Sequence, residues 1–521
     1  MDLEKIEINA DFEEAIKKME DENTNLFITG KAGAGKSTLL SYFCKNTKKE
    51  YAVLAPTGVA ALNVKGQTIH RFFNFYVDIT PTKIQKGEVK PKEDNEKLYK
   101  NIKTIIIDEV SMLRADLLDC IDIFLKHYGP SPGERFGGVQ MIFIGDLYQL
   151  PPVVIGKEAE LFNKHYQSPY FFSSHAFENF EIEVIELDKI YRQKDINFIN
   201  LLNKIRNNSV ESNDIELLNT RHIGNYKPEE SKFFINLTST NSKADEINKE
   251  YLSKLKGKAY KSTAEILGDF DKSSYPTSVE LEYKLGSQIM LLNNDSNDRW
   301  VNGTIATIEK KKKDEEGREY LVIRLIDKKK YYNIAPYKWE ISRYYFDGIK
   351  IESEVVGSFV QYPFRLAWAI TIHKSQGKTF DNVIIDIGRG VFATGQMYVA
   401  LSRCTSFEGV ILKTPIKKNH IRTDYRIFSF LTKHQYQKSE KTLFLEDKIT
   451  IINQAIKEEK KLEIIYLKAN DTKSKRIISP YSVKNEKFKG KSFIGIKAYC
   501  HNRFEERMFR VDRILKLNIN V

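Results

Sequence analysis

A glycine-rich stretch near the start of the chain has the composition and spacing of a phosphate-binding turn. Residues 26–38 read LFITGKAGAGKST, an apolar run that leads into a complete GxxxxGK[ST] pattern. In such a turn the backbone N–H groups converge on phosphate oxygens, and the N-terminus of the next helix adds its partial positive charge. The residues that we expect to form this phosphate site are Gly30, Gly33, Ala34, Gly35, Lys36, Ser37 and Thr38.

Two of these residues and two carboxylates have separate expected roles. Lys36 would reach the β- and γ-phosphates of a nucleoside triphosphate, and the Ser37 hydroxyl would bind Mg²⁺. The apolar run 104–107 ends in Asp108 and Glu109, and parallel strands bind ligands at their carboxyl ends. Asp108 would hold Mg²⁺ from the side opposite Ser37, and Glu109 would orient and deprotonate the attacking water.

A further apolar run supplies an amide to the same edge of the sheet. Residues 141–144 read MIFI and lead to GDLYQLPP at 145–152. The Gln149 side chain is expected to contact the γ-phosphate or its attacking water, as amides do in other phosphate-loop enzymes. The set predicts an enzyme that hydrolyses a nucleoside triphosphate.

The elements that must position these residues follow a strand–helix–strand order. Residues 9–20 have helical spacing, and residues 51–55 form a second buried strand before a turn at 56–58. This order predicts a parallel sheet. Residues 76–101 contain two prolines and many charges and look inserted.

Composition narrows the class of protein. The 521 residues are too many for one ordinary domain, and the net charge of +12 suggests a polyanionic partner, although a solvated lysine-rich surface gives the same total. The four cysteines include no CxxC pair, so neither a zinc site nor a disulfide framework is expected. No signal peptide or membrane-length apolar run is visible, which predicts a soluble cytoplasmic protein with no membrane partner.

Seven ordered pieces of the sequence resemble the PIF family of superfamily 1B DNA helicases, close to its RecD-like branch. They are TGKAGAGKST at 29–38, APTGVAALNVKGQTIHRFF at 55–73, IIIDEVSML at 105–113, FIGDLYQLPPV at 143–153, ELDKIYRQ at 186–193, RLAWAITIHKSQGKTFDNV at 365–383 and YVALSRC at 398–404.

The resemblance implies an α/β fold with two RecA-like domains and ATP between them. The implied parts are domain 1A at 1–185 with a wedge insertion 1B at 76–101, domain 2A at 186–283 and 357–436, an SH3-like β-barrel insertion 2B at 284–356, a linker at 437–447 and a mostly-β WYL-like domain at 448–521.

The resemblance also assigns roles in the second half of the chain. Arg192 and Arg403 would be arginine fingers; taken alone, either arginine would more often form a surface ion pair, and only the motif context favours the finger role. Gln376 and Gly377 would contact the nucleotide. The residues on motifs that face single-stranded DNA are Thr57, His70, Thr240, Asn241, His373 and Lys374. Taken singly, the two histidines are also compatible with satisfied core positions.

The sequence departs from the family pattern at one position upstream of the phosphate loop. The family often carries a glutamine there that reads adenine, but residues 10–14 are Ala-Asp-Phe-Glu-Glu. ATP remains the expected nucleotide.

The barrel is expected from short strands at 287–292, 303–308, 320–326 and 331–334. Its aromatic residues favour core and rim positions over base-stacking platforms, the set being Trp300, Tyr331, Tyr332 and Trp339.

The tail concentrates positive charge. Residues 446–521 hold 18 lysines and arginines against 10 aspartates and glutamates, a net charge of +8. A helix is expected from Lys448, followed by strands at 462–467, 492–498 and 508–511. The pieces RIISPY at 476–481, AYC at 498–500 and RMFRVDRI at 507–514 resemble a WYL domain, although its name-giving tripeptide is replaced by Ile-Gly-Ile at 494–496. The resemblance implies a nucleic-acid or ligand-sensing module, with a packing appendage as the alternative.

Together these features predict an ATP- and Mg²⁺-dependent 5′ to 3′ DNA helicase. It would act as a monomeric motor on single-stranded DNA and on forked or structured DNA, with RNA–DNA hybrids as further candidate substrates. One alternative is the motor subunit of a RecD-like nuclease complex. The other is a regulator in which ATP hydrolysis is a switch and the WYL-like domain senses a ligand.

Overall fold

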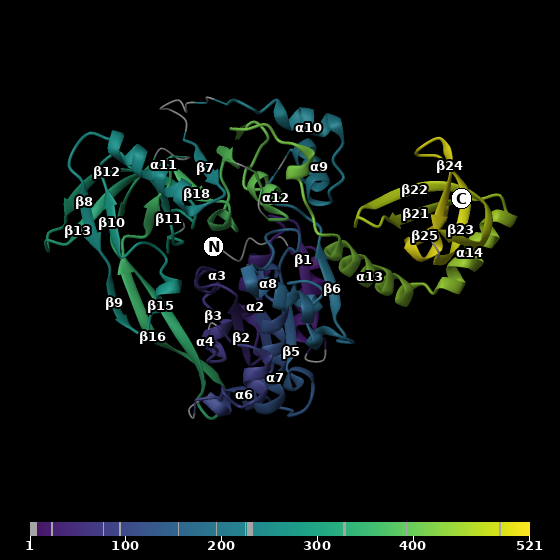
Figure 1. The fold of residues 1–521 in the computed structure, drawn as a ribbon, viewed down its shortest axis with the longest axis horizontal. Coiled ribbons are helices and arrows are strands. Elements are labelled where there is room, and N and C mark those ends of the chain that lie inside the picture. The colour runs from purple at the N-terminus through teal and green to yellow at the C-terminus, as the bar shows by residue number, and fades with distance from the viewer. Residues whose placement is uncertain are drawn as a thin grey trace. The chain divides into compact units, whose positions relative to one another are not determined.

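The computed structural model describes residues 8–21, 24–76, 78–92, 95–154, 156–193, 195–224, 226, 233–297, 299–326, 330–388, 390–391, 393–488 and 491–520. These residues form two compact units. The first consists of Met1–Arg206 and Val210–Arg422, and the second of Asn207–Ser209 and Thr423–Val521. Figure 1 labels the elements of both units.

The first unit begins with a lobe built on a six-stranded, fully parallel sheet, here called lobe 1. The sheet order is β3-β2-β4-β5-β1-β6. Its strands are β1 (Leu26–Gly30), β2 (Tyr51–Ala55), β3 (Gln67–Thr68), β4 (Thr104–Ile107), β5 (Gln140–Ile144) and β6 (Glu183–Leu187). Strands β1, β4 and β5 are buried at every position, as expected for a sheet covered on both faces.

Eight helices belong to the described part of lobe 1. They are α1 (Ala10–Glu20), α2 (Lys36–Asn46), α3 (Gly58–Asn63), α4 (Ile69–Phe72), α5 (Pro81–Gln85), α6 (Glu96–Asn101), α7 (Ala115–Tyr128) and α8 (Gly156–His165). The predicted helix at 9–20 is thus α1, which buries Phe12, Ala15 and Met19. The segment at 76–101 carries α5 and α6.

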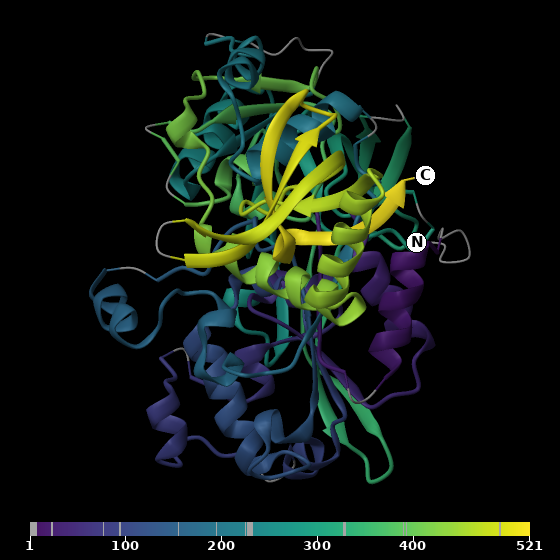
Figure 2. The same ribbon diagram turned by 90° about the vertical axis from the view of Figure 1, so that its right-hand side faces the viewer.

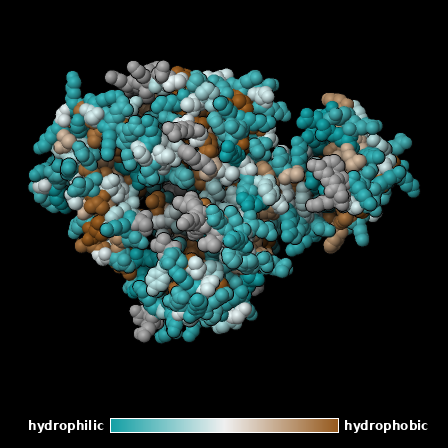
Figure 3. All heavy atoms as spheres, viewed as in Figure 1, coloured by the Kyte–Doolittle hydropathy of each residue, from teal (hydrophilic) through white to brown (hydrophobic). Residues whose placement is uncertain are grey.

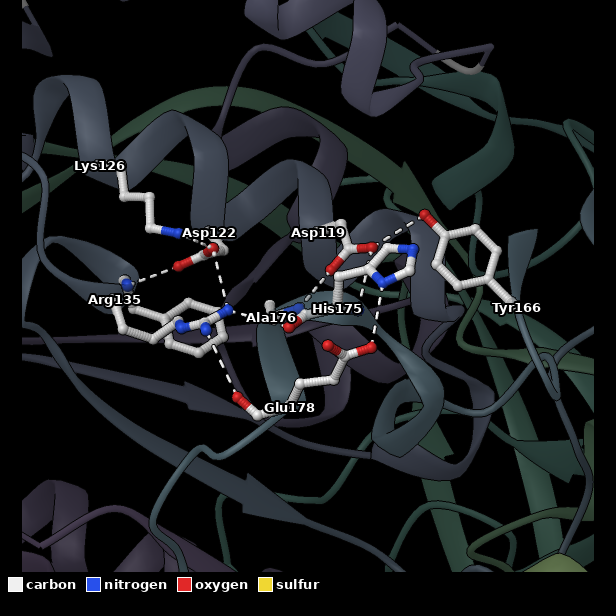
Figure 4. A network of polar contacts seen from close by, with 9 residues as sticks. Asp119, Asp122, Lys126, Arg135, Tyr166, His175, Ala176 and Glu178 are labelled. Carbon is white, nitrogen blue, oxygen red and sulfur yellow. Dashed lines mark hydrogen bonds and ion pairs between the residues drawn. The ribbon is translucent and has the colours of Figure 1, made fainter.

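Helix α7 is fixed to its surroundings by two buried carboxylates (Figure 4). Asp119 accepts hydrogen bonds from the backbone N–H groups of His175 (3.3 Å) and Ala176 (2.7 Å) and from the Tyr166 hydroxyl (2.9 Å). One turn further on, Asp122 accepts from the N–H of Phe136 at 2.7 Å. Phe136 has a φ of +49°, so the carboxylate holds a left-handed turn in place.

The second lobe of this unit, here called lobe 2, has a four-stranded parallel sheet in the order β18-β7-β19-β20. Its strands are β7 (Ile235–Thr238), β18 (Ala369–Thr371), β19 (Val383–Asp386) and β20 (Val410–Leu412), and its helices are α9 (Ile196–Arg206), α10 (Ser212–Asn219), α11 (Asn241–Lys254) and α12 (Gln396–Leu401). Two parallel-sheet lobes confirm the predicted RecA-like architecture.

Between β7 and β18 the chain forms an antiparallel β-rich insertion. Its strands are β8 (Tyr260–Thr263), β9 (Glu265–Gly268), β10 (Glu280–Tyr283), β11 (Gln288–Leu291), β12 (Ile305–Lys313), β13 (Glu319–Leu325), β14 (Tyr331–Ile334), β15 (Tyr337–Phe346), β16 (Ile351–Gln361) and β17 (Phe364–Leu366). The four strands expected in the barrel correspond to β11–β14. The insertion is wider than the predicted range 284–356, because β17 completes the sheet of β11 and because β9 pairs with β16. These short edge strands carry too little alternation to be found from sequence.

The aromatic residues of the insertion divide between core and surface. Trp300 and Trp339 are buried, whereas Tyr331 is 60% exposed. The tryptophans therefore pack inside the insertion, as expected. Tyr331 lies on its surface.

The long hairpin β15–β16 reaches back to lobe 1 (Figure 1). The Val53 N–H donates to the Tyr344 hydroxyl at 3.3 Å, and the Ile351 N–H donates to the Glu50 carboxylate at 2.5 Å. The Tyr344 ring also meets Phe72 edge-on, with 6.0 Å between ring centroids. The insertion is thus tied to lobe 1 as well as to lobe 2.

The second unit is a five-stranded antiparallel sheet with two helices (Figure 2). The sheet order is β24-β23-β22-β21-β25. Its elements are α13 (Tyr425–Thr442), α14 (Leu445–Lys457), β21 (Lys461–Leu467), β22 (Lys473–Phe488), β23 (Lys491–Cys500), β24 (Glu505–Arg510) and β25 (Ile514–Asn520). The unit has its own core, which includes Ile452, Ile464 and Ile496.

The prediction of a linker at 437–447 is wrong, because most of this segment is helical. Helix α13 runs through Thr442, and α14 begins at Leu445. The Ser439 hydroxyl hydrogen-bonds the carbonyl oxygens of Ile514 (3.0 Å) and Leu515 (3.1 Å), so this stretch packs on β25. The segment was interpreted as a linker because its sequence is polar and has no apolar stripe. Lysine, glutamine and glutamate are nevertheless good helix formers, which is why a helix forms there.

Among the described residues, no helix is long and apolar enough to cross a membrane. Hydrophilic residues dominate the face seen in Figure 3.

Candidate nucleotide and DNA site

The glycine-rich turn connects β1 to α2 and is closed by a residue from beyond β6. Gly33 and Gly35 have φ values of +83° and +88°, which glycine adopts without strain. A Cβ on Gly33 would lie 2.5 Å from the Cβ of Arg192. The Tyr191 N–H donates to the Gly33 carbonyl at 2.9 Å, so the predicted arginine finger lies directly against the loop.

Lys36 is half-buried beneath this loop. Its Nζ donates to the carbonyl oxygens of Gly30 (2.8 Å) and Lys31 (3.2 Å). Burial lowers the pKa of Lys36, and the carboxylates of Asp146 and Glu109 act against that shift. The ammonium is therefore held by backbone oxygens at the position where phosphate oxygens could replace them.

The two adjacent carboxylates lie at the carboxyl end of β4. Burial raises the pKa of Asp108 to about 7, and the neighbouring Glu109 adds to the shift. Burial also raises the pKa of Glu109. Glu109 has a φ of +51°, a strained conformation for a residue with a side chain and one that clusters at functional sites.

Gln376 of lobe 2 joins two predicted catalytic residues of lobe 1. Its Nε2 donates to Glu109 Oε2 at 3.1 Å and to Gln149 Oε1 at 3.2 Å. The same amide thus contacts the expected general base and the expected water-positioning residue. Gly377 follows it with a φ of +76°.

Arg192 and Arg403 meet at the end of α12. Arg192 Nη1 donates to the Ser402 carbonyl at 3.3 Å, and Arg403 Nη2 donates to the Ser402 hydroxyl at 2.9 Å. Burial, followed by the charge of Arg192, lowers the pKa of Arg403 to about 9, and Glu109 opposes the shift. Two cations are therefore gathered on the side of the site that faces Glu109.

Arg403 is also bound to backbone. Its Nε donates to the Val399 carbonyl at 2.9 Å, and its Nη1 donates to the carbonyls of Ser375 (3.4 Å) and Lys378 (3.3 Å). The side chain thus connects α12 to the turn that holds Gln376.

Sequence reasoning missed a buried network behind the loop. Asp146 accepts from the Tyr398 hydroxyl at 3.3 Å, and that hydroxyl accepts from the Ala32 N–H at 3.1 Å. Arg206 lies 3.5 Å from Asp146 and stacks on the Tyr148 ring, 3.8 Å from its centroid. Asp146 and Tyr398 lie within the segments 143–153 and 398–404 that resemble the family, and this position could have marked them as site residues. Nothing local distinguishes Arg206 from an ordinary basic residue at a helix end.

Ser37 and Asp108 fit a magnesium site of the kind that phosphate-loop enzymes use. No group of three His, Cys, Asp or Glu residues that could hold a metal occurs in the described ranges. Mg²⁺ needs no such cluster, because one or two protein oxygens and the substrate phosphates suffice. The raised pKa of Asp108 gives this carboxylate a reason to bind a cation.

The predicted DNA-facing residues lie at the carboxyl edges of the two sheets. Thr57 follows β2 and His70 follows β3, and these strands are parallel neighbours. Thr57 caps α3 by accepting from the Ala60 N–H at 3.3 Å. Burial lowers the pKa of His70, so it is a neutral hydrogen-bonding group near pH 7.

The corresponding residues of lobe 2 are exposed. Thr240 and Asn241 follow β7, whose parallel neighbour β18 leads to His373 and Lys374. Thr240 caps α11 by accepting from the Lys243 N–H at 3.3 Å. His373 and Lys374 share one 3₁₀ turn, His373–Ser375, which ends immediately before Gln376.

Comparison with known proteins identifies the family. A family model described as a PIF1-like helicase matches residues 7–216, and a WYL domain model matches residues 447–519. The ATP-dependent DNA helicase Pif1 of Campylobacter jejuni is 30% identical over 439 residues, covering 79% of this chain and 95% of that protein. This chain belongs to the Pif1 helicase family.

Solved structures of another Pif1 helicase extend the likeness to three dimensions. The Bacteroides Pif1 complex with ADP-AlF4 has a TM-score of 0.77 at 33% identity and covers 83% of this Pif1-family chain and 98% of its own. Bacteroides Pif1 bound to single-stranded DNA has a TM-score of 0.59 at 34% identity and covers 82% and 96%. The chain spans 58% to 65% of the length of several other curated Pif1 relatives.

Proposed function

We propose that this Pif1-family chain is an ATP-dependent DNA helicase that moves 5′ to 3′ along single-stranded DNA and unwinds forked or structured DNA. The observation that carries the proposal is the contact of Gln376, from lobe 2, with Glu109 and Gln149, in lobe 1. It joins the hydrolytic residues to the turn that carries His373 and Lys374. The proposed nucleotide site and the proposed DNA site are thus one peptide turn apart.

The residues of the nucleotide site divide the chemistry between them. The loop at 30–38 holds the phosphates through backbone N–H groups, and Lys36 neutralises charge on the β- and γ-phosphates. Glu109 accepts the proton of the attacking water, which Gln149 positions. Arg192 and Arg403 stabilise the charge that develops on the transferring phosphoryl group.

Mg²⁺ is the proposed cofactor, held by Ser37 and Asp108. When bound, it neutralises charge on the phosphate oxygens. A divalent cation also favours the ionised form of Asp108, whose pKa lies at about 7 without one.

In the proposed coupling between hydrolysis and movement, the 3₁₀ turn connects the DNA contacts to the nucleotide site. DNA held by His373 and Lys374 fixes the turn, and the turn fixes Gln376 against Glu109. Loss of the γ-phosphate then changes the contacts of Arg192 and Arg403, which releases one lobe from the other. Each cycle of closing and reopening advances the chain along the strand.

The DNA contacts that we propose are independent of base sequence. Thr57, Thr240 and Asn241 offer hydroxyl and amide groups at helix N-termini, where backbone N–H groups also point toward a ligand.

We propose that the motor is a monomer, that it acts in the cytoplasm, and that RNA–DNA hybrids are also unwound.

The C-terminal unit is proposed to be a second nucleic-acid contact. Its net charge of +8 over residues 446–521 supports this role. Basic residues also lie close together there: the pKa of Lys468 is lowered first by burial and then by the charges of Arg476, Arg503 and Arg507. A ligand-sensing role is the alternative for this unit.

ATPase activity measured with and without single-stranded DNA tests the coupling. The double variant His373→Ala, Lys374→Ala is expected to keep the DNA-free rate and lose most of the stimulation. Lys254→Ala is the matched control, because Lys254 is exposed at the opposite end of α11 from Thr240 and pairs with Glu250. Full stimulation in the double variant would contradict the proposed DNA site.

A further inference from the structure

A cavity of about 350 Å³ lies in the C-terminal unit. It is lined by Ile456, Glu459, Lys460, Ser479, Pro480, Tyr481, Tyr499 and Glu506. These residues come from the end of α14 and from β22, β23 and β24. A cavity of this volume lies at the lower end of the range that binds small molecules.

The sheet aligns three of these side chains in one row. Ser479 pairs with Tyr499, and Tyr499 pairs with Glu506 on the next strand. The register shifts between Pro480 and Ser482, because Pro480 has no N–H to give to the ladder. This bulge turns Tyr481 toward the same cavity, as bulges do beside binding sites.

Both tyrosines keep accessible ring surface. Tyr481 is 48% exposed and Tyr499 is 37% exposed, although each lies on a strand in the middle of the sheet. Tyr481 and Glu506 both line the cavity, so one aromatic ring and one negative charge face the same space.

The second carboxylate comes from a different element. Glu459 follows α14 in the left-handed region, with a φ of +52°, at a position where glycine is the usual residue. Lys460, the one cation in the cavity lining, is paired with Glu458 at 3.1 Å. The lining is therefore locally negative in a unit with a net charge of +8.

We propose that this cavity binds a small organic cation, an amine or quaternary ammonium compound with an aliphatic body. Aromatic faces and carboxylates attract such cations together, through cation–π and charge-assisted contacts. Phosphate groups are disfavoured at the same place by Glu459 and Glu506. The site is thus separate from the basic residues proposed to contact nucleic acid.

Isothermal titration calorimetry on the full-length protein with agmatine, cadaverine and choline tests the proposal. At least one of the three is expected to bind with a dissociation constant below about 1 mM. We use this value as the weakest affinity that counts as specific binding of a small ligand. Glu506→Gln should weaken that binding about tenfold or more, since it removes a charge-assisted contact while keeping the shape. Tyr499→Leu should weaken it several-fold.

Glu505→Gln is the matched control, because Glu505 precedes Glu506 on β24 and lies outside the cavity lining. It should leave the affinity unchanged, which separates specific binding from general attraction of amines to an acidic surface. Circular dichroism checks that Glu506→Gln keeps the fold. Absence of binding by all three amines, or equal weakening by Glu505→Gln and Glu506→Gln, would overturn the proposal.

Discussion

Lys36 and Glu109 carry the two most separable roles in the nucleotide site. Lys36 contacts loop carbonyls that phosphate oxygens would replace, so Lys36→Ala should weaken binding of ATP and abolish turnover. Glu109→Gln keeps the hydrogen bond from Gln376 within reach but removes the base, so turnover should fall by about 10²- to 10⁴-fold with nucleotide binding retained. Steady-state ATPase and nucleotide titration on both variants check this. Near-normal turnover in either variant would contradict the assigned role.

Arg192 is the better of the two arginines for testing a finger role, because Arg403 also connects α12 to the turn of Ser375. Arg192→Ala should lower kcat about a thousandfold or more while nucleotide affinity changes less. A pre-steady-state ATPase assay with parallel nucleotide titration measures both quantities. Equal losses in the two would show that Arg192 binds the ground state instead.

For single residues, the sequence predicts which side chains belong to the site when they lie in a local motif. Lys36, Asp108, Glu109 and Gln149 follow strands that can be recognised from a short window, and Gln376 was found through resemblance. The pairing of Arg206 with Asp146 joins residues 60 positions apart in the sequence and requires the fold. No local pattern specifies such a contact.

Helix α7 is the element that we expect to keep the carboxyl edge of the lobe 1 sheet in place. Helix α7 begins soon after Glu109 and is fixed by Asp119, which accepts three hydrogen bonds. Asp119→Asn replaces one acceptor oxygen by an NH₂ group, so at least one donor loses its partner. The free energy of unfolding of the first unit should fall by about 1–3 kcal/mol.

Urea denaturation followed by fluorescence measures that change, with Glu96→Gln as the control because the Glu96 side chain is 54% exposed and lies outside the network of Figure 4. An unchanged midpoint for Asp119→Asn would show that the hydrogen bonds of Asp119 drawn in Figure 4 contribute nothing to stability.

The elements differ in how far sequence could predict them. The parallel strands β1, β2, β4 and β5 are continuous apolar runs and were found within one residue. The hairpin β15–β16 was missed, because its burial alternates irregularly and its tip depends on contacts of Tyr344 with Val53 and Phe72. Strand identity there is set by tertiary contacts.

For the whole molecule, the boundary between the two units determines where the chain can be cut. Ser439 packs against Ile514, so truncation near Glu440 would divide a helix that belongs to the second unit. A chain ending at Arg422 should instead keep a folded motor with ATPase activity. Its binding to single-stranded DNA should weaken and depend less on salt, because a unit with net positive charge is lost.

Fluorescence anisotropy across a salt series on the full-length chain, residues 1–422 and residues 423–521 measures this. The isolated unit has its own core and should fold. Equal DNA affinity of the full-length and shortened chains would assign the second unit to ligand binding or packing.

Strand separation on duplexes with a 5′ or a 3′ single-stranded tail tests the central claim most directly. With ATP and Mg²⁺ the chain should unwind the 5′-tailed duplex and leave the 3′-tailed one intact, and Glu109→Gln should unwind neither. Unwinding of the 3′-tailed duplex alone, or ATP hydrolysis without any strand separation on either substrate, would contradict the account of this chain as a 5′ to 3′ helicase.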